Sequence, residues 1–348
     1  MRTRFPGAEQ VQLPGTVYEQ VLTSQQVDVR EVDGGTRLTI PVTNRGDAVG
    51  LLQLDLPYRP DEEVVADIAT AGHALAYIVV ANRRHTDLFE WGQRSTPFTL
   101  AAEIQRRLLP GAFTCETSQF TVAGWLEPAS SIGGDTFDYT VDQHSLQVSI
   151  TDAVGHDVAA AVLATVLVGS LRNERRRGVD LGEQASNAND ALATHASAGQ
   201  FVTGQMLHID LNSGAATIVN AGHPFPLRLR RGRVEEIELE IDLPFGLMAG
   251  RSFSLQRLPL EAGDRIVLLT DGMMERNARQ ADIHTRLADT GELHPRQVVH
   301  ALGDAVMHAT GGNLLDDATV MCLDWHGGPP RPRVSAGGAN IGTGGPPA

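Results

Sequence analysis

A strand pattern that ends in an aspartate and leads directly into a helix constrains the fold of this chain most strongly. It spans residues 145–160, SLQVSITDAVGHDVAA, where apolar residues alternate with polar ones up to Asp152. Alternation with a period of two is typical of a strand with one buried face. Gly155 permits a turn, and Asp157 is a candidate N-cap for the Ala-rich helix that follows. A single aspartate of this kind is often only a turn residue, so its meaning depends on similar motifs elsewhere.

Many short strand patterns surround this stretch, and the helical patterns lie in separate blocks. Strands in runs and helices in blocks favour antiparallel sheets covered by helices, an α+β fold, over a βαβ fold. The expected strands are 120–126, 137–141, 146–150, 204–210, 215–220, 226–229, 234–239, 265–269 and 319–323. The expected helices are 157–177, 181–198 and 295–308.

The N-terminal region shows a different pattern, with two strands followed by a helix. Residues 37–42 and 48–56 read as strands joined by an Asn-Arg-Gly-Asp turn, and a helix begins after Pro60. This arrangement resembles the C-terminal half of a GAF-type sensory domain. We therefore expect a partial GAF-like segment at residues 1–85, either a working sensor or a degenerate one.

A second helix is expected to link this segment to the rest of the chain, within a linker at residues 86–112. Thr96 and Pro97 suit its N-cap and first turn, and Leu100, Ile104 and Leu108 form an apolar stripe. The helix could pack on its own domain, dock in two ways that alter the catalytic region, or pair across the axis of a homodimer. The main domain is then 113–326, and the Gly- and Pro-rich residues 327–348 are expected to be a disordered tail.

Charge and composition narrow the class of protein. A net charge of -14 argues against nucleic acid and anionic membranes as partners. Cys115 and Cys322 lack the spacing of metal ligands and are expected to be buried free thiols. The first residues lack the apolar core of a signal peptide, and the apolar run 74–81 is too short to cross a bilayer. We therefore expect a cytosolic protein that does not enter membranes.

Four motifs place carboxylates at strand ends beside glycine or another carboxylate. Acidic residues that end neighbouring strands gather at one rim of a sheet, where their repulsion raises at least one pKa unless cations neutralise them. Carboxylate and carbonyl oxygens without Cys or His clusters suit Mg²⁺ or Mn²⁺. Two such ions would share a water, lower its pKa and hold a phosphoryl group for attack. The motifs are GGD at Asp135 with Asp138 nearby, TDAVGH at Asp152, LLTDG at Asp271 and LLDDAT at Asp316.

These motifs, in this order and together with NAGHP at residues 220–224 and LPFG at 243–246, resemble the SpoIIE/RsbU-type metal-dependent serine/threonine protein phosphatases of the PPM class. The resemblance spans about residues 100–324. It implies two antiparallel sheets packed as a sandwich and flanked by helices. It also implies two Mn²⁺ or Mg²⁺ ions, with Asp152 bridging both, a ligand from the carbonyl of Ala153, and the remaining ligands from Asp135, Asp271 and Asp316. Thr136, where an aromatic residue is usual, and Asp157, where glycine is usual, depart from the pattern without removing a ligand.

Several residues near these motifs have open roles. The candidate catalytic residues are Asp152, Asp271 and His156. His156 could act as a general acid, although histidine in a Gly-His turn is often structural. The same alternatives hold for His223. Asp317 could orient Asp316 or bind metal itself. Arg276 and Arg279 could contact phosphate or lie on a solvated face. The basic cluster at residues 172–177 is expected to complement the dipole of its helix.

The leading hypothesis is therefore a metal-dependent phosphatase acting on phosphoserine or phosphothreonine in a protein. The family resemblance suggests, as substrate, a phosphorylated anti-sigma-factor antagonist in bacterial partner-switching signalling. The alternative is a catalytically weak scaffold that senses a signal and binds a regulatory partner without turnover.

Overall fold

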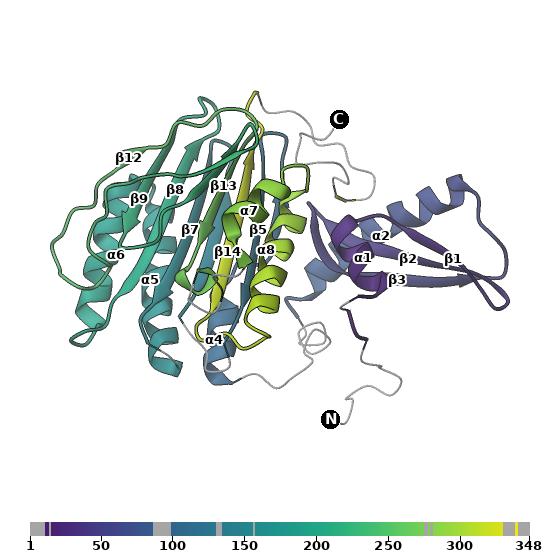
Figure 1. The fold of residues 1–348 in the computed structure, drawn as a ribbon, viewed down its shortest axis with the longest axis horizontal. Coiled ribbons are helices and arrows are strands. Elements are labelled where there is room, and N and C mark those ends of the chain that lie inside the picture. The colour runs from purple at the N-terminus through teal and green to yellow at the C-terminus, as the bar shows by residue number, and fades with distance from the viewer. Residues whose placement is uncertain are drawn as a thin grey trace.

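The chain forms a small N-terminal unit and a larger sandwich of sheets and helices (Figure 1). The computed structural model describes residues 11–13, 15–85, 99–129, 134–155, 157–274, 278, 281–329 and 338–339. For Asp157, only the backbone is described.

The N-terminal unit is a three-stranded antiparallel sheet in the order β1-β2-β3, accompanied by two helices. The two predicted strands and the predicted helix are present, and Asp61 caps that helix by accepting a hydrogen bond from the Val64 amide at 2.9 Å. The elements are α1 (Val17–Ser24), β1 (Asp28–Val32), β2 (Gly35–Asn44), β3 (Asp47–Leu56) and α2 (Glu62–Asn82).

Helix α2 is more apolar than the sequence reading suggested. By length and composition it could span a membrane, with a mean hydropathy of 1.7 in its most apolar window. Its small residues Gly72 and Ala76 are buried, and a side-chain carbon at position 72 would lie 3.0 Å from Ile40 of β2. The helix therefore uses its small residues to pack closely on the sheet.

The linker helix α4 (Leu100–Leu108) is capped by Thr99, and the predicted cap residues Thr96 and Pro97 lie outside the described residues. The expected apolar stripe is only partly correct. Leu100 is 66% exposed, whereas the buried face consists of Ala101, Gln105 and Leu108. The helix therefore buries a polar side chain that the apolar pattern did not predict.

The larger domain contains a six-stranded and a five-stranded antiparallel sheet, which confirms the predicted α+β sandwich. Their orders are β11-β10-β13-β14-β5-β4 and β12-β9-β8-β7-β6. The first sheet is built from β4 (Thr114–Glu116), β5 (Phe120–Glu127), β10 (Leu227–Arg230), β11 (Arg233–Glu236), β13 (Asp264–Leu269) and β14 (Ala318–Trp325). The second is built from β6 (Thr136–Val141), β7 (Ser145–Ala153), β8 (Val202–Asp210), β9 (Ala216–Ala221) and β12 (Gln256–Arg257).

Helices cover both outer faces, so the domain has four layers (Figure 1). One apolar cluster fills the space between the sheets, a second lies under α5 and α6, and a third lies under α7 and α8. Cys115 and Cys322 are buried free thiols in these clusters, as predicted. The helices are α5 (Asp157–Arg177), α6 (Leu181–His195), α7 (Ile283–Asp289) and α8 (Pro295–Ala309), with a 3₁₀ turn η1 (Asp271–Met273).

Charged contacts fasten α5 to its neighbours. Arg172 donates to both carboxylate oxygens of Asp138 at 3.0 Å and to the carbonyl of Leu108 at 2.5 Å, and Arg175 also reaches Asp138 at 3.3 Å. The expectation that these arginines serve the helix dipole is therefore incomplete. They hold α5 against β6 and against the end of α4.

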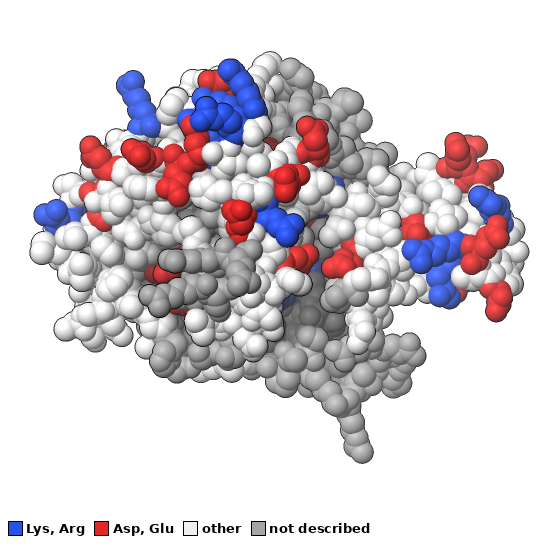
Figure 2. Space-filling model, in the orientation of Figure 1, with Lys and Arg blue, Asp and Glu red and all other residues white. Residues whose placement is uncertain are grey.

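The C-terminal residues touch the rest of the molecule where they are described. The carbonyl of Gly328 accepts from Gln119 at 2.8 Å, and the carbonyl of Gly338 accepts from the Gly46 amide at 2.9 Å. The other residues beyond 329 for which we expected disorder lie outside the described residues. On the described part of the face in Figure 2, acidic and arginine side chains are interspersed.

Arg265 gives the first prediction. It is buried, donates to both oxygens of Asp324 at 2.7 and 2.8 Å, and also binds the carbonyls of Thr290 and Leu293. Replacing Arg265 with Met leaves a buried carboxylate without its partner, so we expect a loss of about 3–5 kcal/mol in the free energy of unfolding. Urea unfolding measures this loss.

The matched control is Arg228→Met, which removes an ion pair whose Glu235 partner is half exposed. It should cost less than about 1 kcal/mol. Equal losses in the two variants would contradict the structural role assigned to Arg265.

Candidate metal centre

The first pair of predicted ligands lies side by side at one end of the five-stranded sheet. Thr136 pairs with Thr151 in the register of β6 and β7, so Asp135 and Asp152 each stand one residue beyond this pair. The Ala153 amide donates to the carbonyl of Gly134 at 3.3 Å. A side chain at position 134 would collide with Ala153, so glycine allows the two segments to approach. The local sequence thus places Asp135 and Asp152 together.

The other acidic residues come from neighbouring strands of the six-stranded sheet. Asp271 follows β13, and Asp316 and Asp317 precede β14, which pairs with β13. A side chain at Gly272 would lie 2.0 Å from the carbonyl oxygen of Asp317, so the two loops pack backbone to backbone. Asp271 is exposed and Asp317 is buried. The four motifs therefore meet where the ends of the two sheets come together.

Hydroxyl groups from the six-stranded sheet hold Asp135, which stands at the end of the five-stranded sheet. Thr270 and Thr319 each donate to the same oxygen of Asp135, at 2.7 and 2.6 Å. Thr270 directly precedes Asp271, and Thr319 lies two residues after Asp317 in the six-stranded sheet. The position of Asp135 is thus fixed across the sandwich.

Gln105 of α4 also contacts these acidic residues, a role that the sequence did not predict. Its side-chain amide donates to the carbonyl of Asp135 at 2.8 Å and to Oδ2 of Asp317 at 2.7 Å. The other oxygen of Asp317 accepts from the Ala129 amide at 2.8 Å. Both oxygens of Asp317 thus accept from protein groups, and its backbone amide donates to Oδ1 of Asp316 at 2.8 Å.

The acidic residues of the cluster affect one another's titration. Burial, followed by the charges of Asp152 and Asp317, raises the pKa of Asp135 well above its usual range. Burial and the charges of Asp271, Asp316 and Asp317 raise the pKa of Asp152 to about 7. The pKa values of Asp271 and Asp316 are also raised, first by burial and then by their acidic neighbours. The rim concentrates negative charge that protons or cations must offset.

This donor set fits Mg²⁺ or Mn²⁺, which prefer carboxylate and carbonyl oxygens and retain water ligands. Among the residues that the structure describes, no three acidic, histidine or cysteine side chains are gathered tightly enough to enclose one ion. The carboxylates share one electrostatic environment and would have to close further around a bound ion.

The remaining candidates have different outcomes. His156, Arg276 and Arg279 lie outside the described residues, as does the side chain of Asp157. His223 is buried, its Nδ1 lies 2.9 Å from the hydroxyl of Thr203, and burial lowers its pKa to about 3. Its backbone amide is held by the side chain of Asn220 at 2.8 Å. Burial thus disfavours the charged form of this histidine, and its Nε2 atom is buried with no hydrogen-bond partner among the described residues.

Gln105 supplies a prediction about metal binding. Replacing Gln105 with Met keeps the size of the side chain but leaves Oδ2 of Asp317 without its donor. Loss of an outer partner of a ligand site typically lowers metal affinity about 10- to 100-fold, and we expect a loss in that range. A Mn²⁺ titration of the variant beside Glu103→Gln, which changes the same helix outside the acidic rim, measures the effect. Equal affinities would contradict it.

A further prediction concerns stability without metal. Because the pKa of Asp152 is higher in the folded state than its usual 3.8, the folded state holds this proton more tightly. The stability that results is complete below about pH 4 and is lost as the pH rises through about 7. In EDTA, the melting temperature should fall by roughly 5 °C between pH 5 and pH 8.

The Asp152→Asn variant lacks the titrating group and should show a flatter pH profile in the same buffers. Thermal melts at several pH values test this. An unchanged slope in the variant would show that Asp152 is not responsible.

Comparisons with known proteins agree with the geometry. The family model described as stage II sporulation protein E (SpoIIE) matches residues 142–326, more than half of the chain. The chain is 21% identical to phosphoserine phosphatase RsbU of Bacillus subtilis over 231 residues, which covers 64% of this chain and 68% of RsbU. It is 23% identical to phosphoserine phosphatase RsbP of the same organism over 184 residues, which covers 51% of this chain and 45% of RsbP.

Solved structures match the fold. The RsbU and RsbW domains of Rv1364c from Mycobacterium tuberculosis superpose with a TM-score of 0.54 at 23% identity, covering 63% of each chain. The phosphatase domain of SpoIIE from Bacillus subtilis, with a fragment of its regulatory domain, gives a TM-score of 0.53 at 18% identity and covers 61% of this chain and 66% of that one. The match thus leaves a third or more of each of these chains uncovered. With its PPM-type sandwich and its acidic rim, the chain belongs to the SpoIIE family of serine/threonine phosphatases.

Proposed function

We propose that this chain removes phosphate from phosphoserine or phosphothreonine in a protein, with two Mn²⁺ or Mg²⁺ ions. The observation that carries this proposal is the convergence of Asp135, Asp152, Asp271 and Asp316, from four separated motifs, at one end of the sandwich. Metal dependence is a property of the PPM class, and the donor set of this rim suits it.

The acidic residues of the rim would bind the metal ions in the proposed reaction. Asp152, the carbonyl of Ala153, Asp135, Asp271 and Asp316 would hold the ions, which when bound supply an activated water and neutralise the charge of the phosphoryl group. Asp271 is exposed and Asp316 is partly exposed, so substrate would approach from their side. Asp135 accepts hydrogen bonds from the hydroxyls of Thr270 and Thr319. The side chain of Gln105 donates to Asp135 and to Asp317. His156 remains the candidate general acid from the sequence.

The proposed substrate is a phosphorylated anti-sigma-factor antagonist. Two matched relatives are named phosphoserine phosphatases, and one matched structure joins an RsbU domain to an RsbW domain. These names support a phosphoprotein substrate in partner-switching signalling. We also infer a cytosolic location. The contact of Gly72 in α2 with β2 supports it, and 11% of the apolar window of this helix is buried.

Phosphate release tests the proposal. Wild-type protein should release phosphate from a phosphoserine protein in Mn²⁺ or Mg²⁺ but not in EDTA. Asp152→Asn and Asp271→Asn should each lose roughly 100-fold or more, because metal ions contribute several kcal/mol to such a reaction.

The matched control is Asp67→Asn on the exposed face of α2, which should retain full activity. A folded wild-type protein that is inactive with every metal would contradict the proposal and favour the scaffold alternative. Activity that survives EDTA or both site variants would also contradict it.

A further inference from the structure

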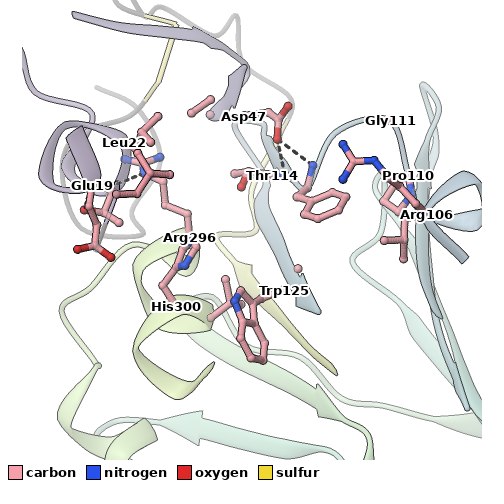
Figure 3. Close-up of a pocket in the computed structure, with 18 of the residues that line it drawn as sticks. Glu19, Leu22, Asp47, Arg106, Pro110, Gly111, Thr114, Trp125, Arg296 and His300 are labelled. Atoms are coloured by element: carbon pink, nitrogen blue, oxygen red, sulfur yellow. Dashed lines mark hydrogen bonds between the residues drawn. The ribbon is translucent and has the colours of Figure 1, made fainter. Parts of the chain in front are cut away.

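A cavity lies between the N-terminal unit and the catalytic sandwich (Figure 3). Its volume is about 650 Å³, within the range of about 300–1,000 Å³ of small-molecule sites. Helix α1 lines it through Glu19 and Leu22, the β2–β3 turn through Asp47, α8 through His300, and β5 through Trp125. Figure 3 shows α1 and α8 on one side of the space and Asp47, Pro110 and Arg106 on the other.

The cavity is held open by contacts at its edges. Asp47 accepts from the amides of Phe113 and Thr114 at 2.8 and 3.3 Å, which fixes the β2–β3 turn to β4. Arg296 of α8 donates to the carbonyl of Thr23 at 3.0 Å and to Glu116 at 2.7 Å, which fixes α1 to the sandwich. The two units are thus joined on both sides of the space between them.

Arginine is the most frequent charged residue of the lining. Four arginines and two carboxylates line the cavity, and among the arginines Arg296 is paired with Glu116 and Arg107 with Glu103. Burial lowers the pKa of His300, so this side chain is neutral at pH 7. Guanidinium groups that line a cavity suit a small anion rather than a cation.

One arginine has unused hydrogen-bonding capacity. The Nε atom of Arg83, at the end of α2, is buried and has no hydrogen-bond partner among the described residues. A buried donor without a partner costs free energy, and a carboxylate or phosphate is the acceptor that best fits a guanidinium group. The charge of Asp47 lies near Arg83, and Oδ1 of Asp47 accepts from two backbone amides.

Two aromatic residues of the lining are fixed in place by their neighbours. Phe113 packs edge-on against Phe137, with ring centroids 5.2 Å apart. Trp125 lies against Gly303 of α8, where a side-chain carbon would come within 2.6 Å of the indole ring. Rigid aromatic walls beside a cationic end suit a ligand with a flat apolar body and one anionic group.

We propose that this cavity binds a small organic anion, with a carboxylate or phosphate near Arg83 and an apolar body against Phe113 and Trp125. Helix α4 lines the cavity through Arg106 and Arg107, and its preceding residue, Gln105, holds the acidic rim. A bound anion would therefore act as an effector of the phosphatase, a consequence that rests on the proposed function.

Calorimetric titration with 2-naphthoate tests binding without reference to activity. We expect saturable binding of one 2-naphthoate per chain, and much weaker binding of 2-naphthylmethanol, which lacks the charge, and of acetate, which lacks the apolar body. Arg83→Gln should weaken 2-naphthoate at least about tenfold, as expected for losing a charge-assisted hydrogen bond. Ala48→Phe should abolish binding by filling the cavity from β3.

The control is Arg59→Gln, which changes an exposed arginine of the same unit outside the cavity and should bind as wild type does. Absence of saturable binding at millimolar 2-naphthoate would overturn the proposal. Equal affinity in wild type and in both cavity variants would also overturn it, as would equal binding of the uncharged alcohol.

The effector role has its own readout. Adding 2-naphthoate should change the rate of phosphate release in the wild type but not in Arg83→Gln. Binding without any change in rate would overturn the effector role. A protein inactive under all conditions would instead overturn the proposed function and leave the binding result to be judged separately.

Discussion

The structure depends on holding like charges together at one partly buried rim. Asp135 and Asp152 extend from adjacent strands of one sheet, and Asp271, Asp316 and Asp317 extend from adjacent strands of the other. This arrangement raises the pKa of Asp135, Asp152, Asp271 and Asp316, for each of which burial is the largest cause. The fold tolerates the repulsion because hydroxyl groups, a backbone amide and the side chain of Gln105 donate hydrogen bonds to Asp135 and Asp317. A rim of this kind is destabilising on its own and favourable when it binds divalent cations.

The rim is connected to the rest of the chain through α4. This helix places Gln105 against Asp135 and Asp317, its last residue Leu108 accepts from Arg172, and its neighbouring arginines line the cavity beside the N-terminal unit. One short helix therefore contacts the acidic rim, the helical layer and the interface between the two units. A displacement of α4 would alter all three sets of contacts, because they are made by the same short helix.

The sequence predicted the strands, the helix blocks and the acidic motifs because each carries a local signal. Alternation marks β7, and glycine beside aspartate marks the strand ends that form the rim. Gln105 escaped prediction because its importance comes from contacts with residues 30 and 212 positions away in sequence. The short elements β4 and β12 were missed for a similar reason, since three and two residues give no period. The sequence assigned Arg172 to the helix dipole because its place near the end of α5 is local information. Its contact with Asp138 of β6 arises only in the tertiary fold.

The central claim is that the acidic rim is a centre for two divalent ions. Electron paramagnetic resonance of free Mn²⁺ during a titration counts the ions bound per chain directly and does not depend on the choice of substrate. We predict two saturable Mn²⁺ ions per wild-type chain and the loss of binding in Asp152→Asn, which removes one of the carboxylates proposed to hold them. A folded wild-type protein that binds no Mn²⁺, or a variant that still binds two ions, would contradict the claim.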